Sequence, residues 1–155
     1  MPRRARLSAP GQVFHLVSRF ARDDRWLDKP SARTAYLRGL EHALQQCDAE
    51  VLAYCLMSNH VHLVVVQGKV PLERFTKSVH TYFAGWIGKR WRPRGKSLGP
   101  VFADRPRVVL VDREVYLLQL VRYVHNNPVR AGVVDRASDS DGRRCGAELP
   151  HTWTG

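Results

Sequence analysis

The chain lacks the features that mark exported and membrane proteins. Its three cysteines, Cys47, Cys55 and Cys145, are widely spaced and no Cys-x-x-Cys occurs, so neither a disulfide framework nor a thiolate zinc site is predicted. No run approaches the roughly 18 apolar residues of a membrane span, and no apolar stretch follows the basic start to make a secretory signal. We therefore expect a cytoplasmic protein.

Acidic residues are also scarce. Asp and Glu together number 14 against 25 Lys and Arg, which leaves a formal net charge of +11. Such an excess is typical of proteins whose partner is a polyanion, and nucleic acid is the leading candidate. A membrane surface is not expected, because the basic residues lie mostly in loops and at the N-terminus rather than on an amphipathic helix.

The order of hydrophobic patterns predicts the fold class. Apolar runs predict four strands, and apolar residues at three- and four-residue steps predict three helices. Their order is strand 12–19, helix 30–47, strand 51–57, strand 60–66, helix 71–87, strand 107–111 and helix 113–126. This order predicts an α+β, ferredoxin-like four-stranded antiparallel sheet with helices on one face, its first and third strands central, plus an additional C-terminal helix that carries Tyr123.

The periodic patterns also predict how the chain divides. Residues 1–134 are expected to form one domain, since a chain of 155 residues is long enough to bury one core. From residue 135 to 155 no apolar period continues, so this part is expected to be a mobile or divergent tail.

The strand at 60–66 carries two imidazoles in an otherwise apolar run. His60 and His62 are two residues apart, so their side chains are expected to project from the same face of the strand. Imidazole is the commonest metal ligand, and the hypothesis is that this pair holds a divalent ion. The alternative is two polar side chains on the solvated face of an edge strand, because roughly 0.3 His-x-His pairs are expected by chance. His15, on the first strand, is interpreted as an ordinary strand histidine.

Two basic segments are candidates for contacts with nucleic-acid phosphates. The first is the N-terminal group Arg3, Arg4 and Arg6. The second is the glycine- and proline-rich stretch 88–100, interpreted as a flexible loop. Its candidate contacts are Lys89, Arg90, Arg92, Arg94 and Lys96, with Trp91 as an exposed ring on which a base can stack.

The last predicted helix places Tyr123 and Asn127 on one flank. Its buried stripe is expected to contain Leu117, Leu120, Val121 and Val124. At about 100° per residue, Tyr123 lies about 100° from the middle of that stripe and Asn127 about 40° from Tyr123. Pro128 disfavours helical geometry at the residue before it, so the helix is expected to end at Asn127.

Four motifs together resemble the REP-associated tyrosine transposases, which are IS200-like members of the HUH single-strand nuclease superfamily. They are Pro2-Arg-Arg with Pro10-Gly, Leu56-Met-Ser-Asn-His-Val-His-Leu-Val64, Gly99-Pro-Val-Phe102 and Tyr123-Val-His-Asn-Asn-Pro-Val-Arg-Ala-Gly132. The resemblance implies that His60, His62 and Asn127 hold Mg²⁺ or Mn²⁺ and that Tyr123 is the nucleophile.

The same resemblance implies the reaction and the partner. The expected activity is metal-dependent cleavage and transfer of single-stranded DNA near REP-like hairpins through a 5′-phosphotyrosine intermediate, with the protein on the nucleoid when bound. Metal-bound water, a substrate oxygen and His125 are candidate acceptors of the phenolic proton. A non-catalytic ferredoxin-like nucleic-acid binder and a replication initiator with the same chemistry remain alternatives. The sequence leaves open whether the protein is a monomer or a homodimer.

Overall fold

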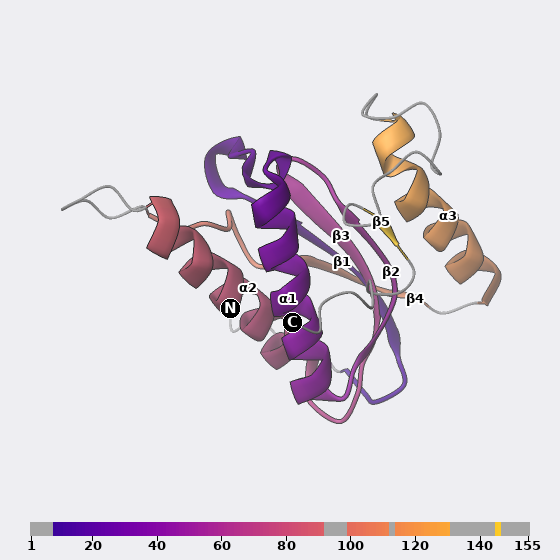
Figure 1. Ribbon diagram of the computed structural model, residues 1–155. Coiled ribbons are helices and arrows are strands. Elements are labelled where there is room, and N and C mark those ends of the chain that lie inside the picture. Colours follow the sequence, from indigo (N-terminus) through magenta and orange to yellow (C-terminus); the bar gives the residue numbers. More distant parts are fainter. Residues whose placement is uncertain (1–7, 92–98, 112–113, 131–144, 147–155) are drawn as a thin grey trace, which may run out of the picture.

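The computed structural model describes residues 8–91, 99–111, 114–130 and 145–146 (Figure 1). The elements are β1 (Val13–Arg19), two 3-10 turns (Ala21–Asp23 and Trp26–Asp28), α1 (Pro30–Cys47), β2 (Glu50–Leu56), β3 (His60–Val66), α2 (Leu72–Trp91), β4 (Arg107–Val111), α3 (Glu114–Arg130) and β5 (Cys145–Gly146). The predicted order of four strands and three helices is confirmed, with β5 as an addition.

The strands form one antiparallel sheet in the order β4-β1-β3-β2-β5. β1 and β3 are the central pair of the four long strands, as the ferredoxin-like prediction requires. In their register Val17 lies opposite His62 and Arg19 lies opposite His60. Residues directly opposite in an antiparallel pair share a face, so this register decides which side chains surround the histidines.

The two faces of the sheet support two separate cores. On one face, Leu16, Leu63 and Val65 pack against α1 and α2, which contribute buried side chains such as Leu40 and Phe83. On the other face, residues of the sheet pack against α3; the buried members of this second core are Ala53, Cys55, Met57, Val64, Val111, Leu120 and Val124. Figure 1 shows α1 and α2 together on one side and α3 apart from them. Because both faces are covered, β3 is apolar on both, which explains its nearly continuous hydrophobic run.

The short strand β5 was not predicted. It pairs with β2 through Tyr54 opposite Gly146 and Cys55 opposite Cys145. Two residues without a hydrophobic period give no strand signal in the sequence. The rest of the predicted tail, 135–144 and 147–155, lies outside the described residues.

Two helix ends differ from the prediction. α2 continues through Gly88 to Trp91, so the start of the predicted basic loop is the last turn of a helix. α3 continues past Asn127 to Arg130 with Pro128 inside it. No described helix combines the length and the apolar composition that crossing a lipid bilayer requires.

Candidate active site

His60 and His62 lie side by side on the face of β3 that α3 covers. Their ring centroids are 5.0 Å apart, with an angle of 71° between the ring planes. The predicted shared face is confirmed. The alternative of a solvated edge strand is wrong, because β3 is central in the sheet and the His62 side chain is only 6% exposed.

Tyr123 lies against this histidine pair. Leu120 and Val124 are buried against the sheet, and this packing turns the intervening Tyr123 toward the end of β3 where the histidines lie. The Tyr123 ring meets the His62 ring edge to face, with centroids 6.1 Å apart and an angle of 83°. Tyr123 nevertheless remains 41% exposed, so the residue borders solvent as well as His62.

Asn127 follows one helical turn after Tyr123 and stabilises α3 locally. Its Nδ2 donates to the backbone oxygen of Tyr123 at 3.2 Å and of Val124 at 3.5 Å. The second of these carbonyls would normally accept from the N–H of residue 128, which proline lacks. The side chain therefore supplies a donor where Pro128 cannot, which explains why the helix does not end at Asn127. The Asn127 Oδ1 is left as an oxygen that can bind a cation.

The hydrogen bonds of the two histidines use the same ring nitrogen in each. Nδ1 of His60 is 2.7 Å from Oδ1 of Asn59, and because a carboxamide oxygen only accepts, His60 donates this bond. Nδ1 of His62 is 3.1 Å from Nε2 of His15. Within the described chain neither Nε2 of the pair makes a hydrogen bond, so both are available as ligands.

Burial keeps these histidines uncharged. Burial, followed by the charges of His60, His15 and Arg19, lowers the pKa of His62 to about 3. Burial and then Arg19 lower the pKa of His60, and burial and then Arg107 lower the pKa of His15. A neutral imidazole is the form that binds a metal ion, so at neutral pH no proton has to be displaced.

The donor set fits a divalent ion bound by neutral ligands. Two imidazole Nε2 atoms and one amide oxygen would leave further coordination positions for water or a phosphate oxygen, as Mg²⁺ and Mn²⁺ sites commonly do. Among the described residues, no three His, Cys, Asp or Glu side chains are grouped to hold a metal. The third protein ligand would therefore come from another residue type, for which Asn127 is the candidate.

Two arginines beside the site were missed by sequence reasoning. Arg19 lies opposite His60, and Arg107 lies opposite Val17, so both are on the face of the histidines. Both side chains are exposed. Their positive charge at the rim of the site suits a phosphate group. Neither lies in the two basic segments singled out in the sequence, and the strand register brings them here.

The predicted basic segments are described only in part. Lys89 and Arg90 are exposed at the end of α2, and the Arg90 guanidinium lies 4.9 Å from the centre of the Trp86 ring. Trp91 was expected to be exposed, but it is half-buried against Trp86 and Trp26, with centroid distances of 5.2 and 5.6 Å. The remaining candidates lie outside the described residues: Arg3, Arg4, Arg6, Arg92, Arg94 and Lys96.

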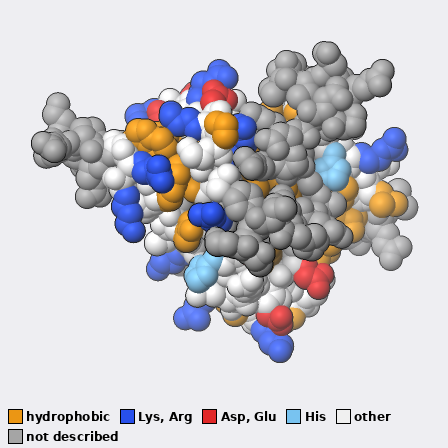
Figure 2. Space-filling model, in the orientation of Figure 1, with side chains coloured by type: hydrophobic (Ala, Val, Ile, Leu, Met, Phe, Trp, Pro, Cys, Tyr) orange, Lys and Arg blue, Asp and Glu red, His pale blue; other side chains and the backbone are white. Residues whose placement is uncertain are grey.

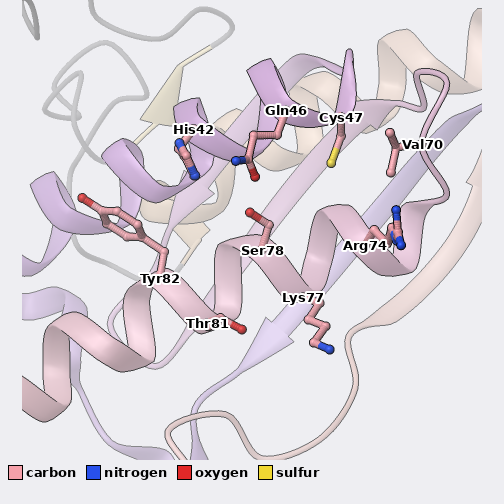
Figure 3. Close-up of a pocket in the computed structure, with 9 residues that line it drawn as sticks. All are labelled: His42, Gln46, Cys47, Val70, Arg74, Lys77, Ser78, Thr81 and Tyr82. Carbon is pink, nitrogen blue, oxygen red and sulfur yellow. The ribbon is translucent and has the colours of Figure 1, made fainter.

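A groove of about 700 Å³ lies between α1 and α2 (Figure 3). His42 and Gln46 of α1 and Arg74, Lys77 and Thr81 of α2 are among its lining residues. Figure 2 shows Lys and Arg side chains spread along the side of the molecule on which α2 lies. The groove is on the side of the sheet that α1 and α2 cover, so it is separate from the site of His62 and Tyr123 on the side that α3 covers.

His125 is not suited to accept the phenolic proton. It lies two residues from Tyr123 on a helix, which turns it about 200° away. Its Nε2 atom is buried and has no hydrogen-bond partner among the described residues. A solvent or substrate oxygen therefore remains as the candidate acceptor.

Comparisons with known proteins identify the family. The profile of the family described as "Transposase IS200 like" matches residues 9–127. This match covers most of the chain, including His60, His62, Tyr123 and Asn127. The chain belongs to the IS200-like transposase family.

Solved structures support the fold. A REP-associated tyrosine transposase bound to a REP hairpin superposes with a TM-score of 0.73 at 17% identity, over 90% of this chain and 80% of that chain. A Deinococcus radiodurans protein assigned as a transposase gives a TM-score of 0.53 at 18% identity, over 81% of this chain and 97% of that chain. A comparison with curated proteins finds no match.

Proposed function

We propose that the protein is a metal-dependent endonuclease and strand transferase acting on single-stranded DNA, with Tyr123 as its nucleophile. The observation that carries this proposal is the contact of the Tyr123 ring with His62, in a chain of the IS200-like transposase family. A partly exposed tyrosine beside neutral imidazoles combines a nucleophile with ligands for a Lewis acid.

The chemistry assigns a role to each side chain. The Tyr123 oxygen attacks phosphorus and the bond from phosphorus to the 3′ oxygen breaks, which leaves a 5′-phosphotyrosine and a 3′-hydroxyl. The phenolic proton passes to a solvent or substrate oxygen, and the leaving 3′ oxygen takes up a proton. The phosphotyrosine conserves the energy of the phosphodiester, so a 3′-hydroxyl can reseal or transfer the strand without nucleotide hydrolysis.

His60, His62 and Asn127 would hold Mg²⁺ or Mn²⁺. Such an ion would neutralise charge on a nonbridging phosphate oxygen and orient the phosphorus for in-line attack. Arg19 and Arg107 flank the histidines and would bind neighbouring phosphates. Lys89 and Arg90 would extend this contact along the DNA backbone.

A DNA hairpin with a single-stranded flank is the proposed substrate. The REP-associated transposase with the similar fold is bound to a REP hairpin. The net charge of +11 suits the phosphate density of such a structure.

A cleavage assay with matched tyrosine variants tests the proposal. Single-stranded hairpin DNA is incubated with the protein and Mn²⁺, Mg²⁺ or EDTA, and the strands are separated under denaturing conditions. Tyr123→Phe should lower cleavage at least about a thousandfold and leave DNA affinity unchanged. Tyr116→Phe is the control, since Tyr116 is an exposed tyrosine of the same helix. Equal cleavage by Tyr123→Phe and wild type would refute the assignment, and DNA binding without cleavage by the wild type would favour a non-catalytic binder.

A further inference from the structure

His15 lies beside His62 although the two residues are 47 positions apart in the sequence. β1 and β3 are antiparallel with Val17 opposite His62, which makes His15 the diagonal neighbour of His62 on the same face. The Nε2 atom of His15 is 3.1 Å from Nδ1 of His62. One nitrogen of each ring is thereby engaged with the other ring.

The two rings meet end to end. Their centroids are 5.3 Å apart and their planes differ by only 14°, while the facing nitrogens are separated by 3.1 Å. The nitrogens must therefore lie close to the line that joins the ring centres. In that position an N–H in the plane of one ring points at the lone pair in the plane of the other, which is the geometry of a hydrogen bond.

We propose that His15 is a positioning residue of the metal site: its Nε2 accepts the Nδ1–H of His62 and fixes the tautomer in which Nε2 of His62 binds the ion. The inference rests on the proposed function. His60 is held in the same way by a different acceptor, since its Nδ1 donates to Asn59 Oδ1. In each of the two histidines the Nδ1–H is thus held by a hydrogen bond, and the Nε2 atom is available to bind the ion. This arrangement orients metal-binding imidazoles and raises their basicity.

His15 acts through His62 rather than as a third ligand. Coordination through Nε2 of His15 would break the hydrogen bond to His62. Within the described residues no three His, Cys, Asp or Glu side chains are grouped to hold a metal. The register of β1 against β3 makes His15 and His62 neighbours on one face of the sheet.

The first experiment needs no substitution. The ¹⁵N shifts and couplings of the imidazole rings in the metal-free wild-type protein at neutral pH report which nitrogen carries the proton. We expect His62 to be protonated on Nδ1. A proton on Nε2 of His62 would mean that His15 donates the bond, which would overturn the proposal.

The second experiment measures Mn²⁺ affinity without DNA, by electron paramagnetic resonance. His15→Leu removes the acceptor and should weaken Mn²⁺ binding 10- to 100-fold. His15→Gln places an amide oxygen near the same position and should restore most of the affinity. His42→Leu is the control, because His42 is exposed on α1 in the separate groove and should change the affinity less than twofold.

The outcomes separate this inference from the proposed function. Wild-type affinity in His15→Leu would overturn the role of His15, and so would equally weak binding by His15→Gln in a folded protein. If the wild type binds no Mn²⁺ through His62, the proposed function fails together with the metal role of His15. The tautomer measurement would still show separately whether His15 accepts or donates the bond.

Discussion

His62 is the side chain on which the site is centred. It contacts His60, His15 and the ring of Tyr123, and it is almost completely buried. A polar side chain in such a position must have its hydrogen bonds satisfied, which His15 does for one nitrogen and a ligand can do for the other. The same burial would hold the His62 ring rigidly as a ligand of the proposed metal ion.

Replacing His62 should remove the metal dependence. His62→Gln keeps a polar side chain of similar size but removes the imidazole nitrogen that is proposed to bind the metal. The Mn²⁺ affinity should therefore fall about 100-fold, and the rate of DNA cleavage should fall with it. Calorimetric titration with Mn²⁺ measures the affinity, and His42→Gln serves as the remote control. Unchanged Mn²⁺ binding by His62→Gln would remove His62 from the ligand set.

A second histidine, the half-buried His80, predicts how stability depends on pH. His80 lies 2.9 Å from the Ser18 hydroxyl and stacks on Phe102 at 3.7 Å, and burial lowers its pKa to about 4. The unfolded chain, with a histidine pKa near 6.5, therefore takes up this proton first. His80 should lower the free energy of unfolding as pH falls from about 6.5 to about 4, by up to about 3 kcal/mol.

The comparison of wild type with His80→Gln isolates this effect. Glutamine cannot titrate in this range and can keep a hydrogen bond to Ser18. Urea denaturation at several pH values should give a flatter stability profile between pH 6.5 and 4 for His80→Gln than for the wild type. Parallel profiles for the two proteins would mean that His80 is not kept neutral by the fold.

At the residue scale, the sequence predicts which side chains share a face when both residues lie on the same strand or helix. The spacing of His60 and His62 on one strand, and of Tyr123 and Asn127 on one helix, was sufficient to place each pair on one face. His15 was interpreted as an ordinary strand histidine, because its proximity to His62 depends on the register of β1 against β3. A single strand carries no information about its register with another.

At the scale of elements, the contact of α1 with α2 depends on Gly39. A Cβ built at Gly39 would lie 2.6 Å from Cδ1 and 3.2 Å from Cβ of Tyr82. The two helices can therefore approach closely only because residue 39 has no side chain. Gly85 of α2, in contrast, has open space where its Cβ would be.

These two glycines provide a matched pair of substitutions. Gly85→Ala should raise the free energy of unfolding by up to about 1 kcal/mol, because alanine has the higher helix propensity. Gly39→Ala gains the same propensity but forces Tyr82 to move, so a net loss of about 1 kcal/mol is expected. Urea denaturation measures both, and stabilisation by Gly39→Ala would contradict the close contact.

The end of α3 shows why element boundaries are harder to predict. Pro128 predicted that the helix ends at Asn127, yet α3 continues to Arg130. The Asn127 amide donates to the carbonyl of Val124, which in a helix without proline would accept from the N–H of residue 128. The prediction that Trp91 is exposed in a loop was wrong for a related reason. The packing of Trp91 against Trp26 stabilises the last turn of α2 beyond Gly88. In both places side-chain contacts override the local preference of the backbone.

At the scale of the whole molecule, the sheet separates two different surfaces. One face carries α1, α2 and the larger core, and the other carries the histidines, Tyr123 and α3. The pattern of strands and helices was sufficient to predict the sheet order, but not which face the histidines occupy. When a strand is apolar on both faces because both are covered, its sequence does not show which helices lie on which face.

The net charge of +11 predicts that DNA binding depends strongly on salt. The logarithm of the binding constant should fall linearly with the logarithm of salt concentration, with a slope of about −0.7 for each phosphate contacted on a single strand. Lys89→Gln combined with Arg90→Gln removes two contacts and should make this slope less steep by about 1.4.

A charge-matched control is available for this measurement. Arg38→Gln combined with Lys69→Gln removes the same charge from exposed positions of α1 and of the turn before α2. Fluorescence anisotropy with labelled hairpin DNA gives the slopes. If both double variants change the slope equally, the contact is not specific to the end of α2 and reflects overall charge alone.

The central claim is that Tyr123 forms the covalent bond to DNA, and mass spectrometry tests it most directly. Wild-type protein is incubated with single-stranded hairpin DNA and Mn²⁺, denatured, and digested with a protease and a nuclease, and the modified peptide is sequenced. The expected result is a nucleotide joined through phosphate to the Tyr123 oxygen. A nucleotide on another residue, or cut DNA with no adduct on Tyr123, would contradict the account.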